Sequence, residues 1–470
     1  MHSANFISPF LIGITSIISI FFGVFAKDRL AKIISILLTF TSLIFALFLS
    51  FGGMLNSIQS NSLNFSLIIG FFCQLIITIS ALASVIIFAN DNRENIKRFE
   101  SYPIIALACS GGIFAIFSYN MIGTYLGIEL MSISGYILAT LNREDKISNE
   151  SSMKYFLMGA VSSCILIYGI SLIYGFSGGN LLMENLFYNI VSQNNVGLIL
   201  GFILFLFGLF FKTTSFPFHF WASDVYRGIN SSSLSFISIT PKLVSFFVIC
   251  KIFIFKIPNI EGAFEVFTPI ITALAGISMI IGAVGALKQE NIKKILAYSG
   301  IVNMGFVLSL FAVKPSTSIF IYYFLIYTFI IIGIFAVISA LQKNSLYSGS
   351  IKNLQGLAHS NPYLSFALAI FMFSSAGIPP LAGFFIKYSV LANLIKQGNY
   401  ILPVVGILSS AIASFYYLKV VKAMYFENQD SEFANNSKSK IHFSIKFLIG
   451  LSLMVNILLV VFANFIFAIS

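Results

Sequence analysis

Long apolar stretches, separated by short polar loops, cover almost the whole chain. A helix needs about 20 apolar residues to cross a bilayer, and on this basis the pattern predicts fourteen spans and no separate soluble domain. The predicted spans are 6–26, 33–52, 66–90, 103–119, 120–141, 154–175, 197–216, 233–255, 264–286, 294–313, 316–341, 363–393, 401–426 and 443–468. The pattern therefore predicts an all-α polytopic membrane protein.

Two of these spans are interrupted by proline. Pro217 follows the seventh span, and the tract GIPP at 377–380 divides the twelfth. Proline cannot donate a backbone hydrogen bond, so each interruption frees backbone groups that need other partners. The two interrupted spans are five apart, an odd number, so the units that contain them would have opposite orientations in the membrane.

This topology predicts two inverted five-helix repeats with broken helices inside a single transmembrane domain, 1–470. The first repeat is expected at 103–255 and the second at 264–426. Three N-terminal helices within 1–102 would precede the repeats, and a C-terminal helix at 443–468 would follow them. Sequence similarity between the halves is weak, so the expectation rests on topology.

The composition agrees with a chain embedded in lipid and argues against several other classes. The 470 residues are 58% hydrophobic and only 9% charged, with a mean hydropathy of +0.95. No soluble domain of this size could bury that much apolar surface. The four cysteines lie in apolar runs and form no CxxC pair, which argues against zinc, iron–sulfur and disulfide frameworks.

The basic residues test the number of spans. If fourteen spans are correct, Lys and Arg should concentrate in alternate loops. Nineteen of the 27 basic residues fall in one alternating set of loops and loop margins, whereas the opposite set holds only Lys256, Lys314 and Lys396. The split predicts both termini on the outer side and accounts for the net charge of +11 by contact with the anionic inner leaflet. A nucleic-acid partner is not expected.

Three ionisable residues lie deep within predicted spans. Glu129 is the one acidic residue that lies neither in a loop nor at a margin, and Lys212 and Lys242 are placed well inside apolar runs. Charges inside spans usually mark an ion or proton path. The alternative for Glu129 is a structural polar contact between helices. Lys212 is the strongest candidate for a group that loads and releases a proton.

Three further candidates have stronger structural alternatives. Lys154 opens its predicted span and could be an anchor whose ammonium reaches the membrane surface. His219 could relay a proton, but a lone histidine near the end of a span is more often a satisfied hydrogen-bonding group. Lys387 follows the break in the twelfth span by seven residues and could be a proton exit site or an interfacial anchor.

Five tracts resemble the antiporter-like membrane subunits of respiratory complex I, the proton-translocating NADH:quinone oxidoreductase, and among these the subunit N type. They are LGIELMSISGYIL, KYFLMGAVSSCILIYG, FKTTSFPFHFWASDVYRG, KKILAYSGIVNMGF and GIPPLAGFFIKY. The resemblance runs through nearly the whole chain, and PFHxWxxDVYxG is its most specific piece. One local departure follows DVYRG, where INSSSL stands before Lys242 in place of the family's usual Ala/Pro-rich turn.

The resemblance implies a role for each candidate residue. Glu129 and Lys154 would form a charged pair that biases the proton affinity of Lys212. His219 and Lys242 would link two half-channels, and Lys387 would lie on the outer half. No cofactor is expected on this chain, and NADH, FMN, iron–sulfur clusters and quinone are expected on other subunits.

The sequence therefore predicts a proton-translocating membrane subunit without a redox centre, embedded in lipid beside other membrane subunits of complex I. The expected location is the bacterial inner membrane or the mitochondrial inner membrane. The first alternative is a subunit of a cation/proton antiporter, which shares the fold and the buried lysines. The second is an unrelated secondary transporter of small solutes, supported only by the broken helices.

Overall fold

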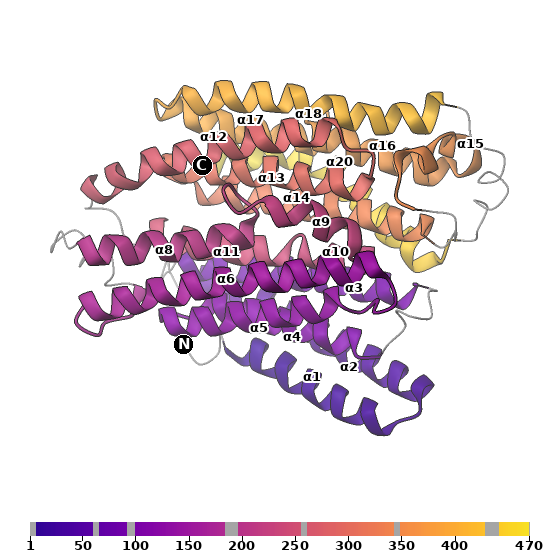
Figure 1. Cartoon of the computed structure of the whole chain (residues 1–470), viewed down its shortest axis with the longest axis horizontal. Coiled ribbons are helices and arrows are strands. Elements are labelled where there is room, and N and C mark those ends of the chain that lie inside the picture. Colours follow the sequence, from indigo (N-terminus) through magenta and orange to yellow (C-terminus); the bar gives the residue numbers. More distant parts are fainter. Residues whose placement is uncertain are drawn as a thin grey trace.

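The computed structural model describes residues 6–59, 65–91, 99–183, 196–254, 261–342, 348–427 and 441–469. Within these ranges the chain is helical and contains no strand, only two isolated β-bridges. The long helices run roughly side by side along the long axis of the molecule (Figure 1). Their bounds are α1 Ile7–Phe25, α2 Asp28–Gln59, α3 Phe65–Ala89, α4 Ser101–Phe117, α5 Met121–Ala139, α6 Lys146–Phe176, α8 Val196–Thr213, α9 Phe220–Gly228, α10 Ser231–Ile237, α11 Thr240–Ile254, α12 Glu261–Leu287, α13 Ile292–Ser309, α14 Thr317–Leu341, α15 Leu357–Ser360, α16 Pro362–Ala376, α17 Ala382–Lys396, α18 Ile401–Phe426 and α20 Phe443–Ile469.

Every predicted span coincides with a helix or with a pair of helices. Among the described residues, twelve helical segments are long and apolar enough to cross a membrane, and α4 and α16 are shorter apolar helices. The prediction of an all-α polytopic membrane protein is confirmed. Two helices extend well beyond the predicted spans. Helix α2 runs from Asp28 to Gln59 around the predicted 33–52. Helix α6 begins at Lys146 rather than at 154, because the Asp145 carboxylate caps it by accepting a hydrogen bond from the Ile147 N–H at 3.0 Å.

Both predicted interruptions are present. After α8 ends at Thr213, Thr214 takes a positive φ of 62° and the chain turns before α9 begins. Helix α16 ends at Gly377, which has a φ of 86° and donates its N–H to the carbonyls of Phe373 and Ser374. A left-handed residue of this kind ends a helix, and glycine adopts it without steric cost.

A third interruption was not predicted. The eighth span is one apolar run in the sequence, but the structure divides it into α10 and α11 at Ser238–Ile239. Pro241 explains the break, because its ring has no N–H to donate to Ile237 and would clash with that carbonyl in a continuous helix. In the first turn of α11 a proline costs nothing, since the first N–H groups of a helix have no partner within it.

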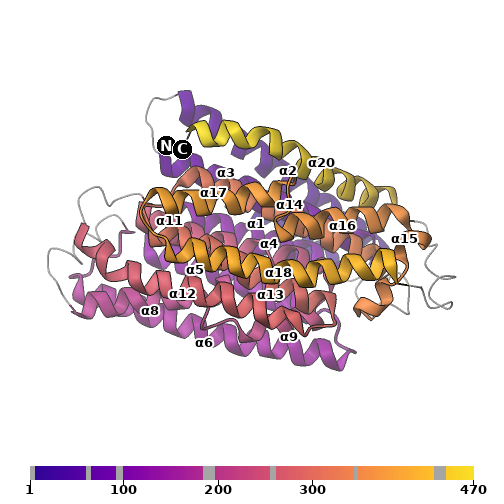
Figure 2. The same ribbon diagram turned by 90° about the horizontal axis from the view of Figure 1, so that it is seen from above.

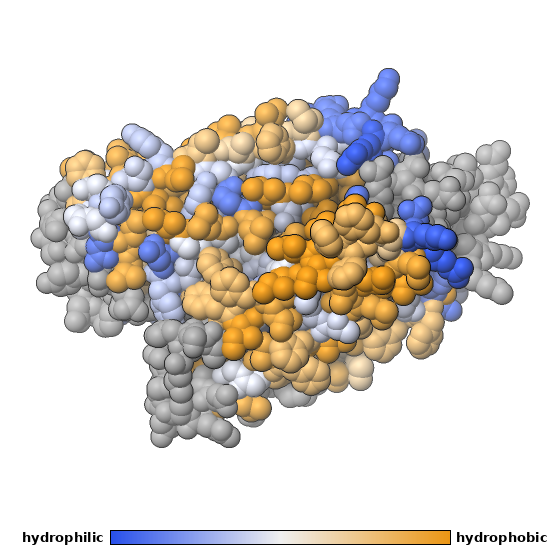
Figure 3. Space-filling view, turned by 90° about the horizontal axis from the view of Figure 1, so that it is seen from below, coloured by the Kyte–Doolittle hydropathy of each residue, from blue (hydrophilic) through white to orange (hydrophobic). Residues whose placement is uncertain are grey.

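The most deeply buried spans lie in the middle of the molecule. They are α10 with α11, α13, and α14, and each is largely enclosed by other helices. Helices α1, α2, α6 and α18 lie outside them (Figures 1 and 2) and expose rows of large apolar side chains. Figure 3 shows that the face below α1 and α2 is mainly hydrophobic across its middle, with hydrophilic residues gathered toward the right. This distribution suits contact with lipid hydrocarbon.

The alternation of loops is visible in the ribbon. The connections α1–α2 and α5–α6, which belong to the basic set, lie toward the right of Figure 1, whereas α1 begins and α20 ends toward the left. The start of the first described helix and the end of the last are therefore at the same end of the bundle, as an even number of crossings requires. Of the basic loop residues, Arg93, Lys97, Arg98, Lys256, Lys343, Lys438 and Lys440 lie outside the described residues.

The contact between α6 and α8 generates a prediction about stability. A Cβ added at Gly169 would lie 2.6 Å from the Phe205 backbone nitrogen and 2.7 Å from the Gly201 carbonyl oxygen. Backbone atoms cannot move away as a side chain can, so the helices would have to separate. We expect Gly169→Ala to destabilise the protein by about 1–3 kcal/mol, measured as a lower Tm in detergent. Gly175→Ala is the matched control, because Gly175 lies on the same helix with open space around it, and an equal Tm for both variants would contradict this packing.

Candidate functional site

Four lysines are buried among the described residues, and three of them lie close to a break in a span. The fourth, Lys293 in the first turn of α13, is 5% exposed and donates to the Ile229 carbonyl at 2.7 Å. Lys212 lies in the last turn of α8, Lys242 near the start of α11 and Lys387 in α17. Their exposed fractions are 5%, 2% and 7%. Each of the three broken spans thus carries one buried lysine close to its break. Lys212 and Lys242 were expected deep within their spans, and all three side chains are enclosed by other helices.

The Lys212 ammonium reaches across to α5. Its Nζ donates to Ser132 Oγ at 2.8 Å and to Tyr136 Oη at 3.2 Å. Glu129 lies one helical turn before Ser132 and attracts the ammonium electrostatically, although the two groups form no direct ion pair in the described structure. Lys212 is therefore held by hydroxyl groups, with a carboxylate nearby on the same helix.

Glu129 contacts α6 at Ser163, not at Lys154. The Ser163 hydroxyl donates to Glu129 Oε1 at 2.5 Å, and the glutamate side chain is partly exposed. Ser163 follows Lys154 by nine residues, or roughly 13.5 Å along a helix. The charged pair of Glu129 with Lys154, which the family resemblance implied, is therefore not formed in this structure.

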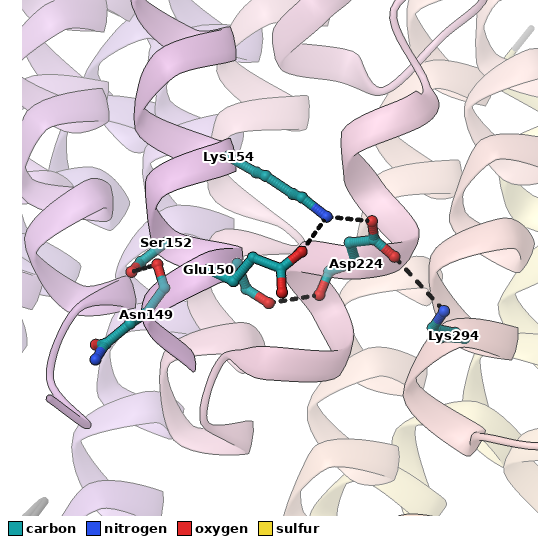
Figure 4. A network of polar contacts seen from close by, with 7 residues as sticks. Asn149, Glu150, Ser152, Lys154, Asp224 and Lys294 are labelled. Carbon is teal, nitrogen blue, oxygen red and sulfur yellow. Dashed lines mark hydrogen bonds and ion pairs between the residues drawn. The ribbon is translucent and has the colours of Figure 1, made fainter. Parts of the chain in front are cut away.

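Lys154 instead belongs to an ionic network at the edge of the bundle (Figure 4). Its Nζ lies 2.6 Å from Glu150 Oε1 and 3.0 Å from Asp224 Oδ2, and Lys294 Nζ lies 3.5 Å from Asp224 Oδ1. Asp224 thereby joins α9 to α6 and to α13. The Lys154 and Asp224 side chains are 44% and 42% exposed, so solvent screens these ion pairs and weakens them. This network fits an anchoring role for Lys154.

Lys242 is enclosed by two tyrosine hydroxyls. Its Nζ donates to Tyr226 Oη at 3.2 Å and to Tyr327 Oη at 3.3 Å, and it lies 5.7 Å from the centre of each ring. Room for the ammonium comes from Gly300 on α13, where an added Cβ would lie 2.8 Å from Nζ. A side chain at position 300 would therefore displace the Lys242 ammonium from this position.

Lys387 is held by the end of α16. Its Nζ donates to the carbonyl oxygens of Ser375 at 2.7 Å and Ala376 at 3.2 Å. These are among the last carbonyls of α16, which have no partner within the helix because α16 stops at Gly377. The negative end of the helix dipole also favours a cation there. The break in the twelfth span thus creates the binding site for the lysine that follows it.

A small polar cavity, about one water molecule in size, lies beside Lys387. Its lining comes from four helices: Ser299 and Asn303 on α13, Tyr327, Ile330 and Ile331 on α14, Ser374 and Ser375 on α16, and Gly383, Ile386 and Lys387 on α17. Tyr327 belongs both to this lining and to the hydroxyl pair around Lys242. The surroundings of the two lysines therefore meet at this side chain.

His219 is buried beside the first break, but it contacts aromatic rings. It stacks on Phe216 with ring centres 5.9 Å apart and lies 4.1 Å from the Phe220 ring. No hydrogen bond from its ring to Lys212 or Lys242 occurs in the part of the chain that the structure describes. Among the described residues, therefore, no direct hydrogen bond from His219 to these lysines supports the expected link between the two half-channels.

Tyrosines are the polar groups that sequence reasoning missed. Tyr136, Tyr226 and Tyr327 hold the two lysines, yet a chain with 20 tyrosines gives no signal for any one of them. A weaker signal was present in the spacing of polar residues inside apolar spans. Ser299 with Asn303, and Tyr323 with Tyr327, are four apart and so lie on one helix face.

Comparison with known proteins places this arrangement in a family. The family described as "NADH:quinone oxidoreductase/Mrp antiporter, TM" matches residues 118–413. NADH-quinone oxidoreductase subunit N of Methylobacterium nodulans is 36% identical over 79% of this chain and 77% of its own length. Subunit N of Paramagnetospirillum magneticum is 36% identical over 86% of this chain and 84% of its own length.

A solved structure shares the fold. A chain of respiratory complex I from Thermus thermophilus, determined with bound aureothin, superposes with a TM-score of 0.77 over 97% of this chain and 99% of that one, at 23% identity. That likeness covers the whole helical bundle, including both predicted broken spans. Together, the family match and the two relatives show that the chain belongs to the NADH:quinone oxidoreductase/Mrp antiporter membrane family, in its NADH-quinone oxidoreductase subunit N group.

Proposed function

We propose that this chain moves protons across the membrane as a subunit of an NADH:quinone oxidoreductase of the complex I type. The observation that carries the proposal is that a buried ammonium group lies beside each of the three broken spans. These groups belong to Lys212, Lys242 and Lys387, and their hydrogen-bond acceptors among the described residues are all neutral oxygens. Charges are expensive within a membrane and are found there along ion and proton paths.

The electron carriers would lie elsewhere in the assembly. The chain is proposed to have no redox centre of its own, with NADH, FMN, iron–sulfur clusters and quinone bound by other subunits. The likeness to subunit N proteins supports this division. Energy from electron transfer would reach this subunit through neighbouring membrane subunits as a conformational or electrostatic change, in a bacterial inner membrane with both termini outside.

In this proposal Glu129 controls the loading of Lys212. The carboxylate lies near the ammonium without an ion pair, so a small movement of α5 against α8 would change their separation. At an effective dielectric of about 20, a change from ~4 to ~8 Å weakens the attraction by roughly 2 kcal/mol. Protons would enter from the basic, inner side, and Lys154 would hold α6 to α9 through Asp224 during the cycle.

The remaining proposed steps run from Lys212 to Lys242 and then to Lys387 and the outside. His219, buried beside the first break, is proposed to support the connection between the half-channels through bound water.

The units 103–255 and 264–426 are proposed as the inverted repeats. What supports the repeats is that each unit contains an interrupted helix with a buried lysine, α8 with Lys212 and α17 with Lys387.

The competing function is a subunit of a cation/proton antiporter. The family description names the Mrp antiporter beside the oxidoreductase, so the buried lysines alone do not separate the two. NADH-driven pumping that needs no sodium favours the oxidoreductase, whereas sodium-dependent proton exchange without a quinone reductase favours the antiporter. The third hypothesis, an unrelated solute transporter, is wrong because the chain belongs to this family.

Lys212→Ala tests the central group of the proposal. With the complex assembled in its native membrane, we expect NADH-driven quinone reduction and proton pumping to fall together by at least about tenfold, as when a positioned proton-transfer group is lost. Lys288→Ala, at an exposed lysine after α12, is the control and should leave both activities unchanged. If Lys212→Ala keeps both activities, Lys212 is a structural charge.

Gly300→Ala tests whether the position of the Lys242 ammonium matters. The added Cβ would lie 2.8 Å from Nζ, so the flexible lysine would move away from its tyrosine hydroxyls. Alanine favours helices over glycine by about 1 kcal/mol, so we expect an unchanged or higher Tm together with slower proton pumping. Gly175→Ala serves again as control. Full pumping by an assembled Gly300→Ala complex would speak against a precise role for Lys242.

A further inference from the structure

Tyr327 lies between the surroundings of Lys242 and those of Lys387. Its hydroxyl accepts the hydrogen bond from Lys242 Nζ at 3.3 Å, and its side chain is 3% exposed. The same side chain lines the cavity that contains Lys387. Tyr226 also accepts from Lys242, but it does not line that cavity. Tyr327 is therefore the group in a position to connect the two lysines.

The cavity offers several partners to a water molecule. Asn303 is fixed there, because its Oδ1 accepts from the Tyr323 hydroxyl at 2.9 Å and its Nδ2 donates to the Ser299 carbonyl at 2.9 Å. The Ser299 hydroxyl is bonded to the Tyr417 hydroxyl. A buried water needs two to four polar partners, and this lining supplies them from fixed side chains rather than mobile ones.

We propose that the Tyr327 hydroxyl, with one water in this cavity, carries the proton between Lys242 and Lys387. This inference rests on the proposed proton-translocating function and assigns a residue to one of its steps. A hydroxyl suits the task because it can accept one hydrogen bond while it donates another. The ammonium of Lys242 has only donors, so the bond between them can only run from Nζ to the tyrosine oxygen.

The step conserves protons without any redox change. The N–H bond of the Lys242 ammonium breaks as a new O–H bond forms on the Tyr327 oxygen. The original hydroxyl proton of Tyr327 passes to the cavity water, and one proton of that water passes to the neutral amine of Lys387. Lys242 ends as a neutral amine and Lys387 as an ammonium held by the Ser375 and Ala376 carbonyls. Rotation of the hydroxyl then restores its starting direction.

Two variants on α14 test this step in the intact complex. Tyr327→Phe removes the hydroxyl and keeps the ring, and Tyr322→Phe is the matched control. Tyr322 is also 3% exposed, but its hydroxyl donates to the Leu459 carbonyl at 3.0 Å, away from the lysines. We expect NADH-driven proton pumping by Tyr327→Phe to fall at least about tenfold and pumping by Tyr322→Phe to match the unaltered complex.

A third variant separates proton transfer from simple positioning of Lys242. Replacing Tyr327 with 3,5-difluorotyrosine keeps the hydroxyl and its hydrogen bond but makes the phenol more acidic. If the hydroxyl carries the proton, the pH profile of pumping shifts. An unchanged profile, even with an inactive Tyr327→Phe, would mean that Tyr327 only holds Lys242 in place and would overturn the inference.

Lys242→Ala distinguishes failure of this inference from failure of the proposed function. If Lys242→Ala stops pumping while Tyr327→Phe pumps normally, the lysine path stands and the assignment of Tyr327 is wrong. If Lys242→Ala itself pumps normally, the proposed path through Lys242 is wrong, and the role of Tyr327 is wrong with it. The fluorotyrosine result remains decisive if Tyr327→Phe fails to assemble.

Discussion

The structure depends on how the three buried ammonium groups beside the helix breaks are satisfied where no water is available from the bilayer. An unpaired charge in an apolar interior is far costlier than any single hydrogen bond can offset. The chain provides neutral oxygens at each lysine, and the broken helices make this possible. At Lys387 the relation is direct, because the carbonyls of Ser375 and Ala376 are free only since α16 ends at Gly377. A continuous twelfth helix would consume these acceptors and leave the ammonium without partners.

The same constraint shapes the packing of the inner helices. Lys242 needs space as well as acceptors, and Gly300 supplies that space by having no side chain on the facing helix. Its two tyrosine partners come from α9 and α14. Asp224, two residues before Tyr226, ties α9 to α6 and α13 through Lys154 and Lys294. This exposed ionic network therefore contacts the same short helix that presents a buried hydroxyl to Lys242.

The sequence predicts the fourteen spans and two of the three breaks because these depend on local chemistry. Apolar length, the tract around Gly377 and the placement of Lys212 and Lys242 well inside apolar runs can all be read from neighbouring residues. The break before Pro241 follows the same proline rule, but the uninterrupted apolar run concealed it. The partners of Lys154 could not be predicted, since Asp224 meets it only after α9 folds back against α6. The roles of Tyr226 and Tyr327 likewise arise from contacts between distant helices.

The kind of oxygen around each lysine determines whether its partners can pass a proton onward or can only hold it on the lysine. Backbone carbonyls only accept hydrogen bonds, so the Ser375 and Ala376 carbonyls can hold a proton on Lys387 but cannot pass it onward. Hydroxyls accept and donate, so the tyrosines and Ser132 around Lys212 and Lys242 can also transmit protons. Lys387 therefore depends on the adjoining polar cavity for exchange, because its direct partners offer no donor. In the proposed function, the two inner lysines would act as relays, whereas Lys387 would act as a holding site that releases its proton only when water reaches it.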